Sequence, residues 1–139
     1  MILTNHAITG AALASLIPNQ PLVGFSVGFL SHFVLDAIPH WDYNLESKKE
    51  DGNKMNDDLV INRKFAKDIL KIGTDGMTGL LLAYFLFSFY MKVSVFAVLC
   101  GAIGAMTPDA LQFVYMKWRH QPLVSFQHFH IWIHTDKTK

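Results

Sequence analysis

The chain has 139 residues, which is enough for one domain and too few for two independent hydrophobic cores. It is 51% apolar with a formal net charge of only +1, which argues against nucleic acid as a partner. No Asp, Glu, Lys or Arg precedes Asp36, and the segments 76–91 and 93–108 are also uncharged. A helix on the surface of a soluble core carries a charged face, so these runs predict membrane-embedded helices.

The first uncharged run predicts a helical hairpin, with helices at about 5–17 and 22–38. The sequence PNQP interrupts this run, and proline within a short polar stretch is typical of a turn between helices. The segment 42–62 is rich in charged residues, so we interpret it as a polar loop.

The runs 76–91 and 93–108 predict a second hairpin that turns near Lys92. The sequence TPD at 107–109 resembles a helix start, with a capping threonine followed by proline in the first turn. The fourth helix is therefore expected to break there and to continue as a short interfacial helix to Trp118.

Together these elements predict an all-α fold for the single domain 1–139, a four-helix antiparallel membrane-embedded bundle with residues 119–139 as an amphipathic surface tail. Some runs are shorter than the roughly 20 residues that a bilayer requires, so a compact soluble helical protein is the alternative. Eleven of the twelve basic residues would lie on one side of the bundle and only Lys92 on the other. The positive-inside rule then places the loop and both termini in the cytoplasm.

Each predicted helix carries a ridge of small residues, at a step of four, that ends in a histidine or an aspartate. Small side chains let helices approach closely in lipid. In an alternating bundle the polar ends of the four ridges meet at the cytoplasmic end. The residues expected to gather there are His6, His32, Asp36, His40, Asp75 and Asp109.

Imidazole and carboxylate groups in these positions point to a divalent metal site, with zinc preferred. His32 and Asp36 are about 6 Å apart along a helix axis and on nearly the same face, so we expect them to bind one ion. His40 lies about 12 Å from His32 on an ideal helix, so it serves a second ion unless Pro39 bends the chain. The segment 40–42 could instead mark only the interfacial exit of the helix.

The sequence FHIWIH near the C-terminus adds His130 and His134, which share a face if the segment is helical. In an extended segment His128 and His130 would share a face instead. With His6 and Asp109, these residues complete the expected ligands for one or two ions.

Each candidate also has a structural interpretation. His6 could simply lie at a helix start, and Asp75 or Asp109 could complement a helix N-terminus. His32 and Asp36 could form a hydrogen-bonded pair, although an acid within an apolar run is costly and usually functional.

Three motifs resemble those of the inner-membrane metal-dependent hydrolases of bacteria: NHAITG near the N-terminus, an acid and a histidine after a hairpin, and GAMTPD late in the chain. Through its His-x-x-x-Asp helix the chain is also distantly similar to the zinc-dependent phospholipase C superfamily, which includes fungal single-strand nucleases. The resemblance implies an all-helical protein of the bacterial inner membrane, a divalent metal, and a phosphoester or lipid substrate.

The positions that match the motifs of the family and superfamily are His6, His32, Asp36, Pro108 and Asp109. The chain departs from the family at Ala110 and Leu111, where an acid and a histidine often follow the Pro-Asp motif. The family's His-Arg-x-x-Thr-His signature is also absent, and the histidines of segment 130–134 stand in its place.

No nucleophile elbow, phosphate-binding glycine loop or cysteine cluster is present in the sequence, so we expect metal-assisted hydrolysis rather than covalent catalysis. The leading hypothesis is a hydrolase among membrane lipids that cleaves a phospholipid or a polyprenyl phosphate. Asp75 is the candidate general base if it is not a ligand. The alternatives are a non-catalytic membrane protein with a structural or metal-binding His/Asp cluster, and a proton or ion carrier.

Overall fold

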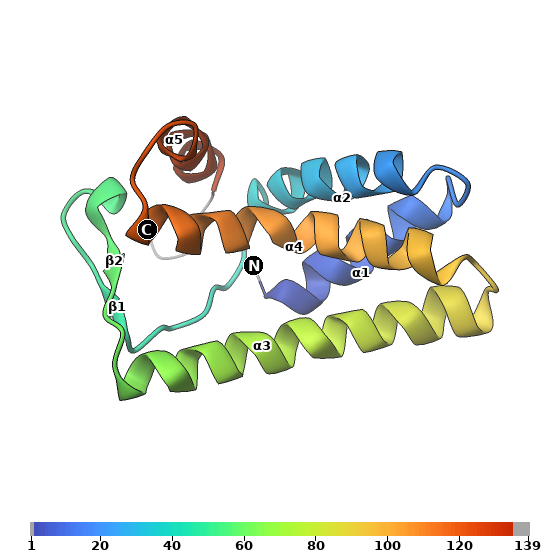
Figure 1. Ribbon diagram of the computed structural model, residues 1–139, viewed down its shortest axis with the longest axis horizontal. Helices are drawn as coiled ribbons and strands as arrows, with labels where there is room; N and C mark the ends of the chain where they lie inside the picture. The colour runs from blue at the N-terminus through green and yellow to red at the C-terminus, as the bar shows by residue number, and fades with distance from the viewer. Residues whose placement is uncertain (1, 135–139) are drawn as a thin grey trace.

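The computed structural model describes residues 2–134, and the predicted all-α fold is confirmed for this part of the chain (Figure 1). The helices, in chain order, are α1 (Leu3–Ser15), α2 (Pro21–Asp36), α3 (Arg63–Ala83) with its π-helical continuation η2 (Tyr84–Tyr90), α4 (Val95–Lys117) and α5 (Leu123–Ile133). The turn between η2 and α4 contains Lys92 with a positive φ of 59°, where the sequence predicted the second turn.

Local sequence explains where several helices begin and end. α2 begins at Pro21, whose missing N–H costs nothing in the first helical position, and it ends just before Pro39. α3 begins after Asn62, whose side-chain oxygen accepts hydrogen bonds from the backbone N–H groups of Lys64 and Phe65 at 2.8 and 3.1 Å.

The polar segment between α2 and α3 is folded against the end of the bundle (Figure 1). It contains the strands β1 (Lys48–Lys49) and β2 (Asp58–Leu59), paired antiparallel, and a 3₁₀ turn, η1 (Lys54–Asn56). The Asp68 carboxylate of α3 accepts hydrogen bonds from the backbone and hydroxyl of Ser47 at 2.8 and 2.6 Å. This contact holds the segment over the start of α3.

The predicted ridges of small residues form the centre of the packing. α4 packs mainly against α1 and α2, whereas α3 packs mainly against α1. At the centre Gly101 of α4 faces Gly10 of α1 and Gly28 of α2, and a Cβ atom on either of these two glycines would collide with the Gly101 carbonyl oxygen. Backbone approach this close requires glycine on both sides of the contact.

The structure corrects two helix boundaries. α3 already begins at Arg63, directly after the predicted loop 42–62 and well before the uncharged run 76–91, because the Asn62 cap and the amphipathic sequence that follows favour a helix despite its charges. α4 does not break at Pro108 but continues to Lys117. The helix loses one hydrogen bond at the proline, while buried Tyr115 beyond it donates a hydrogen bond to the Met55 carbonyl at 2.9 Å and keeps the last turns in place.

Part of the segment expected as a surface tail forms α5, which packs against α2 and α4 at the same end of the molecule as the β-ribbon (Figure 1). Its inner face buries Gln127 and His130, while Trp132 on the outer face is 78% exposed. Residues 135–139 of the predicted tail lie outside the part of the chain that the structure describes.

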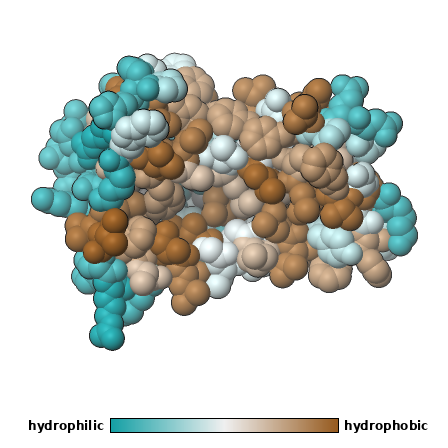
Figure 2. Space-filling view, in the orientation of Figure 1, coloured by the Kyte–Doolittle hydropathy of each residue, from teal (hydrophilic) through white to brown (hydrophobic). Residues whose placement is uncertain are grey.

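The surface is hydrophilic at the two ends of the molecule and carries a broad hydrophobic band between them (Figure 2). Large apolar side chains of the long helices are exposed, among them Leu30, Val34, Leu81, Phe85 and Ile103. Within residues 2–134, two helical segments are long and apolar enough to cross a membrane, Arg63–Tyr90 and Val95–Lys117.

Gly101→Ala is expected to lower the free energy of unfolding by about 1–3 kcal/mol, because its methyl group would meet the Gly10 carbonyl and Ala14 in a contact that cannot widen locally. The measurement is the denaturant dependence of far-UV circular dichroism in detergent. The control is Gly73→Ala on the exposed side of α3, where a Cβ has open space and better helix propensity should stabilise by about 0.5–1 kcal/mol. Equal stability of wild type and Gly101→Ala would contradict the packing described.

Candidate metal centre

Histidine and aspartate side chains from five separate segments converge at the end of the bundle that carries the polar segment. α1 supplies His6, α2 supplies His32 and Asp36, the exit of α2 supplies His40, α4 supplies Asp109, and α5 supplies His130 and His134. These are the residues that the sequence singled out as metal ligands. Asp75, the candidate general base, has a different set of contacts.

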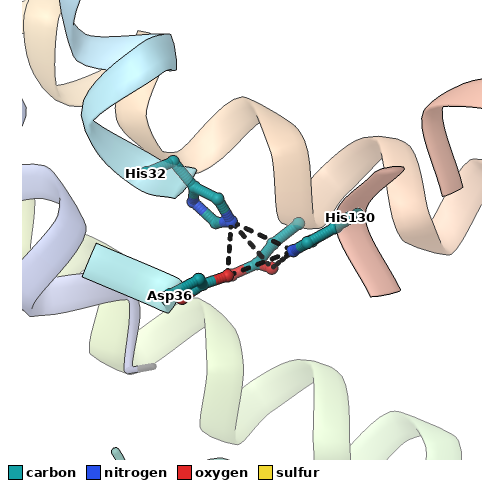
Figure 3. Close-up of side chains that lie close together, drawn as sticks. His32, Asp36 and His130 are labelled. Carbon is teal, nitrogen blue, oxygen red and sulfur yellow. Dashed lines mark hydrogen bonds and ion pairs between the residues drawn. The ribbon is translucent and has the colours of Figure 1, made fainter. Parts of the chain in front are cut away.

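The first group consists of His32, Asp36, Asp109 and His130, whose nearest donor atoms lie within 4.8 Å of one another. Figure 3 shows His32 and Asp36 from α2 meeting His130 from α5. Asp36 Oδ2 is 3.0 Å from His32 Nε2 and 3.1 Å from His130 Nε2, and the two Nε2 atoms are 3.3 Å apart. Asp109 Oδ1 lies 3.6 Å from His32 Nε2 and 3.9 Å from His130 Nε2.

These spacings fit a tetrahedral ion with two nitrogen and two oxygen ligands. Zinc–nitrogen bonds of about 2.0–2.1 Å place the ligand atoms of a tetrahedron about 3.3–3.4 Å apart. The His32–His130 distance of 3.3 Å equals this spacing, and the Asp36 and Asp109 distances bracket it. The group could therefore hold a divalent metal ion.

Backbone contacts orient two of the imidazoles toward the site. His32 Nδ1 lies 2.8 Å from the Ala105 carbonyl oxygen, and His40 Nδ1 lies 2.6 Å from the Ile38 carbonyl oxygen. Because a carbonyl oxygen only accepts, both Nδ1 atoms carry the proton, and in the neutral rings the Nε2 lone pairs face the cluster. A hydrogen bond from the other ring nitrogen, as these two histidines make from Nδ1, usually accompanies metal binding by a histidine.

A second group shares Asp36 with the first and contains His40 and His134. The Nε2 atoms of His40 and His134 are 3.3 Å apart, and the carboxylate of Asp42 lies 3.3 Å from the first and 3.2 Å from the second. Asp36 Oδ1 is 3.6 Å from His40 Nε2. Asp36 Oδ2, which faces the first group, is also 3.8 Å from His134 Nε2. The fully buried Asp36 is thus shared by both groups, and the pair of groups could hold two ions.

His6 lies beside both groups without belonging to either. Its ring is completely buried and stacks on that of His32 at 4.1 Å between centroids, and its Nε2 is 3.3 Å from Asp36 Oδ1. Neither ring nitrogen of His6 makes a hydrogen bond within residues 2–134. A buried imidazole without a hydrogen bond requires an explanation, and the Nε2 atom of His6 is directed at the Asp36 carboxylate that the two groups share.

Asp75 supports the N-terminus of α1. Its carboxylate accepts hydrogen bonds from the backbone N–H of Thr4 at 3.0 Å, from the Thr4 hydroxyl at 2.8 Å, and from the Tyr43 hydroxyl. Burial, followed by the hydrogen bond to Asp75, raises the pKa of Tyr43 above its ordinary value, so its hydroxyl stays protonated and donates. The general-base assignment of Asp75 stays a prediction, beside this structural role.

Sequence reasoning did not include Asp42 among the ligands, and it did not single out Gln127, a buried residue one turn before His130 on α5. Asp42 follows His40 by two residues, and in an extended exit from α2 that spacing places both side chains on one face, which was the available signal. Gln127 carries no comparable signal, because a glutamine three residues before a histidine is unremarkable until the helix is docked.

A cleft of about 940 Å³ opens onto the cluster. His40, Asp42, Asp109, His130 and His134 form part of its lining. Apolar side chains from α4 and α5 form another part, namely Phe113, Met116 and Ile131, and Lys48 and Lys54 of the polar segment also line the cleft. The candidate ligands are therefore reached through a cleft that is partly apolar and partly charged.

No protein-family model, curated protein or solved structure matches the chain. The resemblance to the bacterial inner-membrane hydrolases stays a prediction.

We expect purified wild-type protein to bind Zn²⁺ and Asp36→Asn to bind it at least about 100-fold more weakly, because loss of the shared ligand should cost more than the 10–100-fold that follows loss of a ligand's hydrogen-bond partner. Asp109→Asn should weaken only the first group and Asp42→Asn only the second. Isothermal titration calorimetry with a competing chelator measures both the stoichiometry and the affinities.

The control for these variants is His128→Ala, which removes an exposed histidine of α5 outside both groups. Zinc affinity unchanged by Asp36→Asn, or lowered as much by His128→Ala, would contradict the site. Absence of bound zinc in wild type would indicate that protons alone hold the histidine–aspartate cluster together.

Proposed function

We propose that this protein is a divalent-metal-dependent hydrolase of the bacterial inner membrane, acting on a phospholipid or a polyprenyl phosphate at the membrane surface. The observation that supports it most directly is the convergence of His32, Asp36, Asp109 and His130 at tetrahedral spacing beside an open cleft. A histidine–aspartate cluster that served only packing would gain nothing from such a cleft.

The chain's own residues divide the work of the reaction. His32, Asp36, Asp109 and His130 hold the ion, and zinc is the best candidate for their two nitrogen and two oxygen donors. A bound divalent ion would lower the pKa of a water ligand from about 15.7 toward 7 and polarise a phosphoryl oxygen. The buried side of the cluster excludes bulk water, since Asp36 and His32 are fully inaccessible to solvent.

The lining of the cleft suits an amphiphilic substrate. Phe113, Met116 and Ile131 offer apolar contact to the first carbons of a lipid chain. Lys48 and Lys54 lie on the same cleft, and cationic side chains are common partners of phosphate oxygens. Lys48 also forms a 3.0 Å ion pair with Asp57, which restricts where its ammonium group can reach.

Membrane embedding is supported by the hydrophobic band and by the three tryptophans. Trp41 at the exit of α2, Trp118 at the end of α4 and Trp132 on α5 are 79%, 59% and 78% exposed, and all lie at the end of the molecule that carries the cluster. Tryptophan concentrates at membrane–water interfaces. With these side chains at headgroup depth, the cleft opens where a lipid phosphate lies.

Zinc-loaded protein is expected to hydrolyse a phospholipid or a polyprenyl phosphate in detergent micelles, and chelated protein is expected to be inactive until zinc is restored. Asp36→Asn should lower kcat/KM by more than about 100-fold because it removes the shared ligand. Release of soluble phosphate or phosphoester measures the rate. A zinc-loaded protein that is inactive on both lipid classes would favour the alternative, a non-catalytic membrane protein with a metal-binding cluster.

The same assay examines Asp75. Loss of a general base by Asp75→Asn would lower kcat by about 10²–10⁴-fold and remove the acidic limb of the pH–rate profile. A fall in unfolding free energy with kcat intact would contradict that assignment and leave the support of α1 as the role of Asp75.

Single cysteines in a Cys100→Ala background test the membrane topology. Met91→Cys, in the exposed turn after η2, should react with a membrane-impermeant maleimide in intact cells, and Gly52→Cys, in the polar segment, should react only after lysis. The reverse labelling pattern would overturn the proposed sidedness. Recovery of the protein in the soluble fraction would overturn membrane embedding.

A further inference from the structure

Two buried polar atoms on α5 lack hydrogen-bond partners within residues 2–134. They are Nδ1 of His130 and Oε1 of Gln127, and the two residues are only 2% and 1% exposed. Buried polar groups are nearly always paired, so each of these two requires an explanation.

The first atom is a donor. His130 directs Nε2 at the cluster, 3.1 Å from Asp36 Oδ2 and 3.3 Å from His32 Nε2. A neutral imidazole that offers Nε2 to a metal carries its proton on Nδ1. His32 and His40 satisfy that proton with the Ala105 and Ile38 carbonyls, whereas the corresponding proton of His130 has no acceptor in the part of the chain that the structure describes.

The second atom is an acceptor close at hand. Gln127 precedes His130 by three residues, which is one helical turn and the same face of α5. Side chains on a helix lean toward its N-terminus, so the His130 ring lies over the turn that contains Gln127. Both residues also line the cleft beside the cluster. The unpaired donor and the unpaired acceptor thus lie one turn apart on the same face of α5, and a change of the glutamine side-chain rotamer would let them pair.

We infer that Gln127 is a positioning residue of the metal centre, whose amide oxygen accepts the Nδ1–H of His130 and thereby holds Nε2 on the ion. This inference rests on the proposed function only in requiring the metal. A hydrogen-bond acceptor on the second nitrogen fixes the tautomer and orientation of a ligating histidine and raises its basicity. Gln127 supplies from a side chain what the backbone supplies to His32 and His40.

The test is the affinity for Zn²⁺ alone, measured by competition calorimetry on full-length protein, so no substrate or activity is needed. Gln127→Leu removes the acceptor at similar volume and should weaken zinc binding by about 10–100-fold. Gln127→Glu provides a stronger acceptor and should bind zinc within about threefold of wild type or more tightly. The control is Gln20→Leu, the same change at an exposed glutamine in the turn before α2, which should leave the affinity unchanged.

Thermal unfolding of the metal-free proteins separates positioning from packing. Gln127→Leu removes a buried unpaired oxygen, so its metal-free form should unfold at the same temperature as wild type or higher. If this variant does not fold, Gln127→Asn, which keeps the amide on a shorter side chain, takes its place with the same expected loss of affinity.

Zinc affinity in Gln127→Leu or Gln127→Asn equal to that of wild type would overturn the positioning role, as would a Gln127→Glu protein that binds as weakly as Gln127→Leu. Failure of wild type itself to bind zinc would overturn the metal centre and this role together. The wild-type titration therefore shows which of the two proposals fails.

Discussion

The structure depends on one backbone contact, the approach of α1 and α2 to α4 at Gly101. Gly10 and Gly28 face this residue from opposite helices, and neither position has room for a Cβ. Because a close backbone contact of this kind leaves no space for a side chain, it sets both the distance and the register of the three helices. That register fixes the position of every side chain that lies on these ridges one or two turns from the glycine contact.

The cluster is the continuation of the same ridges. Gly28 is followed at steps of four by His32 and Asp36, and Gly101 is followed by Ala105 and Asp109. The small side chains of its ridge leave the Ala105 carbonyl accessible to α2, and this carbonyl is the acceptor that orients the His32 ring. The contact that holds the helices together therefore also brings an imidazole and two carboxylates into one volume, where their mutual charge favours a divalent cation.

α5 and the polar segment complete the site from outside the three-helix core. α5 adds His130 and His134, while the exit of α2 adds His40 and Asp42, and Asp36 lies between the two sets of donors. Outside this cluster α5 meets α2 through aromatic side chains, with Phe126 and Phe129 of α5 at 5.8 and 4.9 Å from Phe33 of α2 between ring centroids. A bound ion would add coordination bonds to this aromatic contact, so it would serve docking as well as chemistry.

The sequence by itself determined the helical class, the first hairpin, the turn near Lys92 and the ridges of small residues. Each of these follows from local periodicity or from the prolines and charged residues that interrupt the apolar runs. It also identified the seven histidines and aspartates that the fold gathers, since polar residues within apolar runs are costly. Only the tertiary structure decided that α4 runs through Pro108, that Asp42 joins the cluster and that Gln127 and His130 are buried where α5 docks. These features depend on contacts between residues far apart in the chain, and a single sequence contains no periodic pattern from which such contacts can be predicted.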